Sequence, residues 1–332
     1  MNSSLVGLSC PNPDYSYSLD GIPESIHKVL MTIFFLVDIY GLVHVWRSEK
    51  LKVCNMRNMM FISLCWLTLA DVSMSVLCTP RIFFPMIGGY SIGIFANLGI
   101  PINIQTFFVL FLIAGGLASI IQLFAQRHHV LVPTGHILNF SQSTRNVLFV
   151  ARHLVLWTML SIVIFYLADD QKALKMEYLK TYACVPPNYM DDNFFVFGNF
   201  YITAIVMMFC ILTTFAESGF YCIHCLLILH STSSKLRSER TKALHIKVLI
   251  LISSQLLIPL IVLVVPCCYI FLSVYRMSYN RILNDLVMKI TSTHGILTVI
   301  VVLIMTSNGF RKKVDESSNN VKKTSILQTV KA

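Results

Sequence analysis

Long apolar stretches separated by short polar segments run along almost the whole of this chain of 332 residues. A helix needs about 20 mostly apolar residues to cross the hydrocarbon core of a bilayer. The stretches that reach this length are His27–Trp46, Met59–Cys78, Ile102–Phe124, Val147–Ala168, Phe194–Leu229, Val248–Val274 and Leu286–Thr306. The pattern predicts an all-α membrane protein, a bundle of seven transmembrane helices.

The composition agrees with this prediction. Hydrophobic residues make up 55% of the chain and charged residues only 13%, against roughly 25% charged in an average soluble domain. The first stretch has the alternative interpretation of a cleaved signal peptide. It follows an acidic tail without Lys or Arg and contains Asp38, whereas a signal peptide begins with basic residues. We interpret it as a true first span.

Basic residues predict the orientation, because Lys and Arg accumulate in cytoplasmic connections. One side has Arg47, Lys50, Lys52, Arg57, Arg127, Arg145, Lys235, Arg237, Arg240, Lys242, Lys247, Arg311, Lys312, Lys313, Lys322, Lys323 and Lys331. The other side has only Arg81, Lys172, Lys175, Lys180, Arg276 and Arg281. We therefore expect an extracellular tail at 1–26, the bundle at 27–306 and a cytoplasmic tail at 307–332. The net charge of +10 then reflects topology and attraction to anionic membrane lipid, and calls for no nucleic-acid partner.

Glycosylation and disulfide chemistry follow from the same orientation. Asn2 begins an Asn-Ser-Ser acceptor sequence in the outer tail, whereas the match at Asn139 lies on the cytoplasmic side and should stay unmodified. Of ten cysteines, Cys10 and Cys184 lie in clearly extracellular segments, where disulfides form. We predict a bridge between them; the alternatives are two free thiols or a pairing with Cys78.

The fifth stretch is unusually long and contains Glu217, a carboxylate tolerated in a membrane only against protein, water or a basic partner. The polar connection after it, at 231–247, is expected to continue the helix. Cys222 and Cys225 lie near its inner end, in apolar surroundings. Packing or palmitoylation is the interpretation there, rather than a redox or metal centre.

Three ionisable residues inside spans mark a candidate site, because burying charge in a membrane is expensive. Asp38, Asp71 and His294 are expected to face the bundle interior, where they form either a polar switch or ion site or a structural hydrogen-bond network. Lys289 lies four residues after Asp285, the favourable order for a helical ion pair.

Two further features suggest movement and a partner surface. Pro259 and Pro266 lie on one face of the sixth span and are candidate hinges, because proline removes a backbone hydrogen bond; the alternative is that proline is simply frequent in membrane helices. Arg127 closes the third span at the cytoplasmic surface. It either holds the bundle inactive, contacts a G protein or anchors to lipid headgroups.

Several segments, in order along the chain, carry a family resemblance. They are Pro80–Gly93, Arg127-His128, Cys184–Pro187, Ile258–Ser273, His294-Gly295 and Phe310-Arg311. With these motifs the chain resembles the nematode serpentine chemoreceptors of class H, or a sister class of the same superfamily. It departs from the pattern at Ala125, where an acidic residue is usual, and at Ser307–Gly309, where Lys-Pro is usual.

The resemblance implies a chemosensory G-protein-coupled receptor with a small-molecule ligand, a heterotrimeric G protein as partner, and a place in the plasma membrane, at the cilium of a sensory neuron. Polar ligand contacts are expected from Asn103, Gln105, Tyr201, Tyr269 and Lys289. G-protein contacts are expected from Arg127, Lys235, Arg237, Arg240 and Lys242. We expect neither a cofactor nor a metal ion.

Two other classes are less favoured. A transporter or channel for a small solute is the main alternative, but repeats and polar broken helices are typical of transporters, and the chain has no evident repeat. An enzyme is disfavoured, since the sequence has no His-Glu-x-x-His segment.

Overall fold

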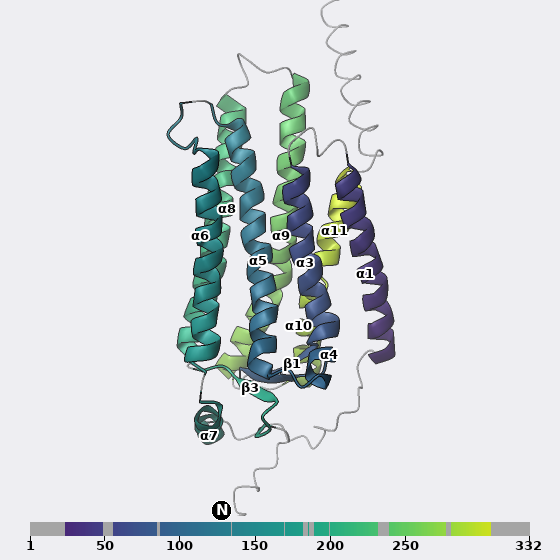
Figure 1. Cartoon of the computed structure of the whole chain (residues 1–332), viewed down its shortest axis with the longest axis vertical. Helices are drawn as coiled ribbons and strands as arrows, with labels where there is room; N and C mark the ends of the chain where they lie inside the picture. The colour runs from purple at the N-terminus through teal and green to yellow at the C-terminus, as the bar shows by residue number, and fades with distance from the viewer. Residues whose placement is uncertain are drawn as a thin grey trace, which may run out of the picture.

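The computed structural model describes residues 24–48, 56–84, 87–133, 135–168, 170–181, 185, 189–198, 200–231, 239–276 and 280–306. Long helices run side by side across the molecule, and short strands gather at one end of them (Figure 1). In chain order the elements are α1 (Glu24–Arg47), α3 (Arg57–Val72), η2 (Ser73–Leu77), β1 (Pro80–Phe83), β2 (Gly88–Ser91), α4 (Ile94–Asn97), α5 (Ile102–Leu131), α6 (Gln142–Ser161), η3 (Ile162–Tyr166), α7 (Gln171–Thr181), β3 (Phe194–Val196), α8 (Phe200–Ser231), α9 (Glu239–Arg276), α10 (Arg281–Thr291) and α11 (His294–Thr306).

The helices confirm the predicted membrane bundle. Among the described residues, six helical segments are long and apolar enough to cross a bilayer, and α10 with α11 form one of them. The 38-residue helix α9 packs against α11, α10 and α5 and completes the bundle. Outward-facing side chains are apolar: Ile205, Phe209 and Leu212 of α8 are each more than half exposed, as expected of a surface that contacts lipid.

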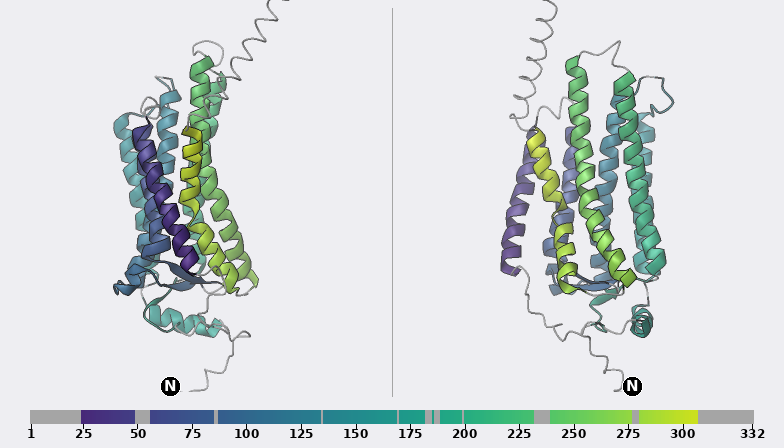
Figure 2. Two further views of the ribbon diagram at one scale, coloured as in Figure 1. Left: turned by 90° about the vertical axis from the view of Figure 1, so that its right-hand side faces the viewer. Right: turned by 180° about the vertical axis from the view of Figure 1, so that it is seen from behind.

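Helix α5 lies at the centre of the packing. It contacts α3, α6, α8 and α9, and the long helices run side by side in the two turned views (Figure 2). Leu123 and Phe124 are fully buried in a cluster that joins α5 to α3, α8 and α11. Gly115 allows the ring of Trp66 to approach the α5 backbone, because a Cβ at this position would overlap the ring.

The structure differs from the prediction at the beginning of the fifth span and in the connection that follows this span. The fifth span begins at Phe200, not at Phe194, because Phe194–Val196 forms strand β3. All three strand residues are apolar and buried, and only Gly198 and Asn199 interrupt the apolar sequence before Phe200, so periodicity does not separate the strand from the helix. The connection at 231–247 was predicted to continue this span. Its second half instead belongs to the next helix, because α9 already begins at Glu239.

A small sheet and a helix cover one end of the bundle, and we call β1, β2, β3 and α7 the lid. The strands are antiparallel in the order β1-β2-β3, with Phe83 opposite Gly88 and Gly88 opposite Val196. Phe194 and Val196 pack into the core of the lid. Phe195 points the other way and packs with residues of α5 and η3, as alternation along a strand requires.

Side chains of α7 tie this helix to the segment that carries β3. The amide of Gln171 donates to the carbonyl oxygen of Val196 at 2.9 Å and accepts from its N–H at 2.8 Å. Nζ of Lys175, a residue only 3% exposed, donates to the carbonyl oxygen of Asp191 at 2.6 Å. The hydroxyl of Tyr189 donates to the carbonyl oxygen of Lys175 at 3.0 Å. The lid is therefore held by backbone partners rather than by contacts between charges alone.

Candidate functional site

The seventh span is broken into α10 and α11 at three consecutive hydroxyl residues. The hydroxyls of Thr291, Ser292 and Thr293 donate to the carbonyl oxygens of Val287, Lys289 and Ile290. Such bonds compete with the helical ladder. The N–H of Thr293 accordingly donates to the third preceding carbonyl, at 3.1 Å, instead of the fourth. The break brings the beginning of α11 against α3.

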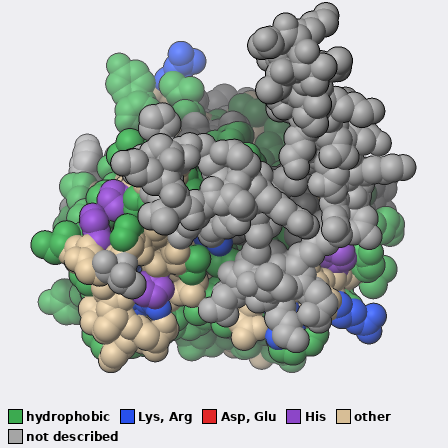
Figure 3. Space-filling view, turned by 90° about the horizontal axis from the view of Figure 1, so that it is seen from above, with side chains coloured by type: hydrophobic (Ala, Val, Ile, Leu, Met, Phe, Trp, Pro, Cys, Tyr) green, Lys and Arg blue, Asp and Glu red, His purple; other side chains and the backbone are tan. Residues whose placement is uncertain are grey.

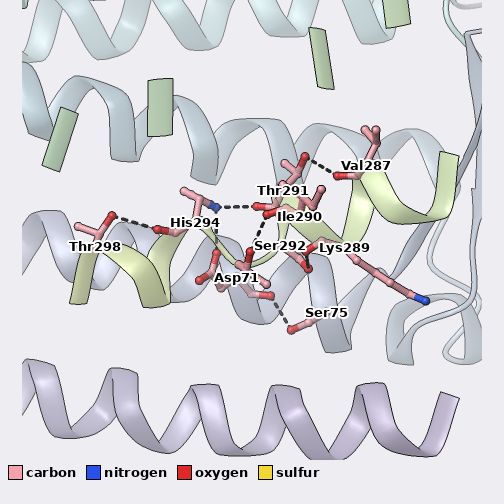
Figure 4. A network of polar contacts seen from close by, with 10 residues as sticks. Asp71, Ser75, Val287, Lys289, Ile290, Thr291, Ser292, His294 and Thr298 are labelled. Atoms are coloured by element: carbon pink, nitrogen blue, oxygen red, sulfur yellow. Dashed lines mark hydrogen bonds and ion pairs between the residues drawn. The ribbon is translucent and has the colours of Figure 1, made fainter. Parts of the chain in front are cut away.

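His294 and Asp71 meet at this break (Figure 4). Nδ1 of His294 lies 3.1 Å from Oδ1 of Asp71 and 2.8 Å from the carbonyl oxygen of Thr291. Gly295 makes the approach possible, because a Cβ there would overlap the Asp71 carboxylate. The contact therefore depends on the small residue as well as on the charged pair.

Asp38 of α1 lies beside the same pair. It is 2% exposed, its Oδ1 has no hydrogen-bond partner, and it is near enough to interact electrostatically with Asp71 and His294. The structure thus brings together Asp38, Asp71 and His294 from α1, α3 and α11. Asp71 contacts the imidazole directly and Asp38 lies near both groups, an arrangement whose stability depends on where protons and counter-charges reside.

A second link joins the lid to the seventh span. Nη1 of Arg81 in β1 lies 2.8 Å from Oδ1 of Asp285 in α10. Asp285 therefore pairs across the fold, rather than with Lys289 as its spacing suggested. At the preceding residue, the hydroxyl of Tyr269 in α9 donates to Oδ1 of Asn284 at 2.5 Å. The lid end of α10 is consequently held by both β1 and α9.

The expected ligand contacts lie mainly at the lid end of the bundle. Gln105 is buried, with Nε2 donating to the carbonyl oxygen of Ile100 and Oε1 unpartnered. Asn103 is half-buried, and its Oδ1 accepts from the N–H of Ile104. Lys289 is half-buried on α10, and its chain extends away from Asp71 (Figure 4). For Tyr201 the structure describes the backbone in α8 but not the side chain.

The candidate hinge and partner residues are placed differently. Helix α9 passes through both prolines without ending; Pro266 is buried, and the side chain of Pro259 lies outside the described residues. Arg127 is 1% exposed and α5 continues past it to Leu131, so the third span does not close at this residue as predicted. Outside the described residues or side chains are Lys235, Arg237, Arg240, Lys242, Cys10, Cys184 and Asn2.

The opposite end of the bundle is where α5 and α8 finish and α6 and α9 begin, and we call it the far end. Here Arg152 of α6 forms an ion pair with Glu217 of α8, which supplies the basic partner expected for that carboxylate. Nε2 of His128 lies 2.8 Å from Nδ1 of His224. Cys225 is fully buried and packs in the main core. Among the described residues, no three His, Cys, Asp or Glu side chains are arranged to hold a metal ion.

Comparison with protein-family models decides the family. The model described as "Serpentine type 7TM GPCR chemoreceptor Srh" matches residues 21–316, which include every helix and strand of the structure. The chain belongs to the Srh chemoreceptor family. A search of curated proteins returns no match. The predicted resemblance is confirmed, and with it a multi-pass membrane receptor of the seven-span type; the Srh proteins are receptors rather than enzymes.

Sequence reasoning missed several parts of this Srh receptor. The lid sheet joins the connection after α3 to the connection before α8, and strands of three or four residues leave little pattern in a sequence. The Arg81–Asp285 pair joins residues 204 positions apart. Burial also lowers the pKa of Lys175, an effect opposed by nearby Asp192 and Asp191; the charge-rich loop alone predicts an exposed lysine. For Arg152–Glu217, the sequence predicted only that Glu217 needs protein, water or a basic partner inside the membrane; it did not identify Arg152 as that partner.

Proposed function

We propose that this Srh receptor detects a small environmental chemical and signals through a heterotrimeric G protein. The observation that carries the proposal is the family match over 21–316, since that family consists of seven-span chemoreceptors of the G-protein-coupled type. The plasma membrane is the proposed location, at the cilium of a sensory neuron and with the lid end outside. The Cys10–Cys184 bridge and glycosylation at Asn2 are part of the same proposal.

The ligand binds under the lid, between the lid-end halves of α5, α8, α9 and α10. Asn103, Gln105, Tyr201, Tyr269 and Lys289 are the proposed polar contacts. Two buried polar atoms support this location: neither Oε1 of Gln105 nor Nδ2 of Asn284 has a hydrogen-bond partner in the described structure. Because an unsatisfied buried polar atom costs about 1–3 kcal/mol, a ligand that bonds to either atom gains affinity.

Signal transfer runs from the lid through the seventh span. A ligand that displaces β1 also displaces α10, because Arg81 binds Asp285. The break at Ser292 and Thr293 allows α10 to move relative to α11, while Asp71 and His294 hold α11 to α3. A ligand with different affinities for two such arrangements shifts their populations. Pro259 and Pro266 are the proposed hinges for α9, which packs against α10 and α11.

The G protein binds at the far end, against Arg127 and the connection that contains Lys235, Arg237, Arg240 and Lys242. In the present arrangement Arg127 is buried. Contact therefore requires movement of the helices around it.

The test is a reporter assay in transfected cells that express the receptor with a G protein, screened against small volatile and water-soluble compounds. An active compound should raise the second messenger only when both proteins are present. Gln105→Ala should weaken the response without changing surface delivery, and Phe209→Ala, on the lipid-facing surface, is the matched control. Replacing Pro259 and Pro266 together by Ala should reduce the maximal response. Receptor-dependent uptake of a solute without any G protein would contradict the proposal and favour a transporter.

A further inference from the structure

A pocket at the far end lies apart from the proposed ligand site and from the Asp71–His294 pair. It is formed by α5, α6, α8 and the connection between α5 and α6. Its lining residues are Gln122, Ala125, His128, His129, Leu138, Phe140, Arg145, Leu148, Arg152 and Tyr221. Cations and histidines thus face an apolar rim of Leu138, Phe140 and Leu148, a combination that suits a ligand with a charged group and an apolar body.

Arg145 is the residue that gives this pocket its chemistry. It lies in the first turn of α6 and is 8% exposed. Its Nη2 donates to Oε1 of Gln142, but its Nε and Nη1 are buried and have no hydrogen-bond partner. A guanidinium presents its donors in a planar fork that matches a carboxylate or phosphate. A buried cation without a partner is strongly destabilising. The unpartnered Nε and Nη1 of Arg145 therefore indicate that an anion binds here.

The groups around Arg145 do not neutralise it. Nδ1 of His129 is also buried without a partner, and Arg145 is near enough to interact electrostatically with that ring. Arg152 forms an ion pair with Glu217, so this carboxylate is already engaged by another guanidinium. The pocket therefore retains the charge of Arg145, and its histidine neighbours add donors rather than negative charge.

The surface of the far end has the same character. Figure 3 looks onto this end, where the described ionisable side chains that can be seen are Lys and Arg in blue and His in purple, with no red acidic side chain among them. A membrane-facing surface of this kind attracts anionic lipid, with about 1 kcal/mol contributed by each Lys or Arg near the headgroups. The pocket lies at this same end of the bundle.

We propose that the α5–α6–α8 pocket binds a phosphate group, with Arg145 as its principal ligand and His129 as a second donor. The source of the phosphate is either the headgroup of an anionic membrane lipid or a soluble phosphate ester. The apolar rim fits the lipid, whose glycerol and acyl carbons would lie against Phe140 and Leu148. This site is independent of the proposed sensory ligand, because it is at the opposite end of the bundle.

The experiment uses the full-length receptor in nanodiscs of phosphatidylcholine with or without phosphatidylinositol 4-phosphate. Lipid retained by the receptor is quantified by native mass spectrometry, and stability is followed by the thermal midpoint. Phosphatidylinositol 4-phosphate should bind and raise the midpoint. Arg145→Gln should reduce its affinity about tenfold, as expected for loss of a charge-assisted hydrogen bond.

Arg57→Gln is the matched control at the same end. The guanidinium of Arg57 already lies over the ring of Trp46, with its carbon 5.0 Å from the ring centroid, so this variant should retain the lipid. In a second arm, inorganic phosphate and inositol 1,4-bisphosphate are titrated into phosphatidylcholine nanodiscs. An Arg145-dependent rise of the midpoint in this arm alone would support the phosphate site and assign it to a soluble ester.

If Arg145→Gln does not fold, the proposal is tested on the wild-type receptor by cross-linking. A phosphoinositide with a photoreactive group on its headgroup should cross-link within residues 138–152. Cross-linking confined to other segments would overturn the proposal. So would equal affinity of wild type, Arg145→Gln and Arg57→Gln for both sources of phosphate.

Discussion

The lid and the far end of this receptor use polar side chains in opposite ways. In the lid, Lys175, Tyr178 and Tyr189 each donate to backbone carbonyl oxygens. Aromatic residues pack against one another in the core of the lid. At the far end, Arg145 and His129 keep buried nitrogen atoms without partners. The polar groups named in the lid already have hydrogen-bond partners within the protein, and these bonds hold the lid in one conformation. The far end retains the capacity to gain stability when something binds.

The largest expected effect tests the tight packing of the lid core. Phe194 is fully buried and contacts the rings of Phe83, Tyr90 and Tyr189. Phe194→Ala should destabilise the lid by about 3–5 kcal/mol, because a large core ring leaves a cavity. Faster hydrogen exchange in 189–198 is the measurement, with the 54% exposed Phe209 replaced by Ala as the control. Equal effects of the two variants would contradict the packing described for the lid.

A smaller effect of opposite sign is expected at the far end. Arg145→Met removes the unpartnered cation and keeps an unbranched side chain. In nanodiscs without anionic lipid this variant should be more stable by about 1–3 kcal/mol, because its buried donors no longer lack partners. The thermal midpoint measures the change. A clear loss of stability would mean that Arg145 is fully satisfied within the protein, and the contrast between the two ends would fail.

The junction between the two ends can be tested at glycine. Gly295→Ala places a methyl group against the Asp71 carboxylate and should cost about 1–3 kcal/mol, as overpacking does. Gly219→Ala is the matched control, since nothing lies within 4 Å of a Cβ at this helical position. That variant should gain up to about 1 kcal/mol from helix propensity. Thermal midpoints that move together would remove the argument for close approach at Gly295.

The two ion pairs provide a more sensitive comparison. Arg81–Asp285 joins the lid to α10, and Arg152–Glu217 joins α6 to α8. Double-mutant cycles with Ala should give coupling energies of about 0.5–1 kcal/mol for each pair, since their side chains are partly exposed. We expect only the Arg81–Asp285 cycle to alter the response to a ligand. An identical loss of response in both cycles would argue against transfer through the lid.

The smallest effect concerns the pH dependence of the lid. Burial lowers the pKa of Lys175 from its ordinary value of 10.5, so the unfolded chain binds more protons just below this pH. The stability of the lid should therefore rise with pH up to about 10.5. Protease protection of the 171–196 segment at increasing pH measures the effect, with Lys175→Met as the variant that should lose it. An unchanged slope in this variant would assign the effect to another group.

Much of the bundle was predictable because the membrane imposes simple requirements. Length and hydropathy located the spans. The cost of burying charge in a membrane predicted that Asp38, Asp71 and His294 face the interior of the bundle. The broken seventh span was not predicted, because Thr291, Ser292 and Thr293 are compatible with a helix until their hydroxyls bond to the backbone.

The lid and the phosphate pocket depend on contacts between distant segments. Strand β3 was merged with the fifth span because all of its side chains are buried. Arg145 was counted among the cytoplasmic basic residues, since a sequence does not show that α5 and α8 enclose it. Sequence therefore predicted which residues belong inside the membrane better than which partners they find there.

The pairing of β2 with β3 has a consequence for how the receptor is made. A ribosome that has finished β1 and β2 must still synthesise α5, α6 and α7 before β3 exists. Until then β2 presents an unpaired edge, a state prone to association with other strands. Closure of the lid is thus a late step in biogenesis, and a truncated product that stops before Phe194 would carry that edge to the quality-control machinery of the cell.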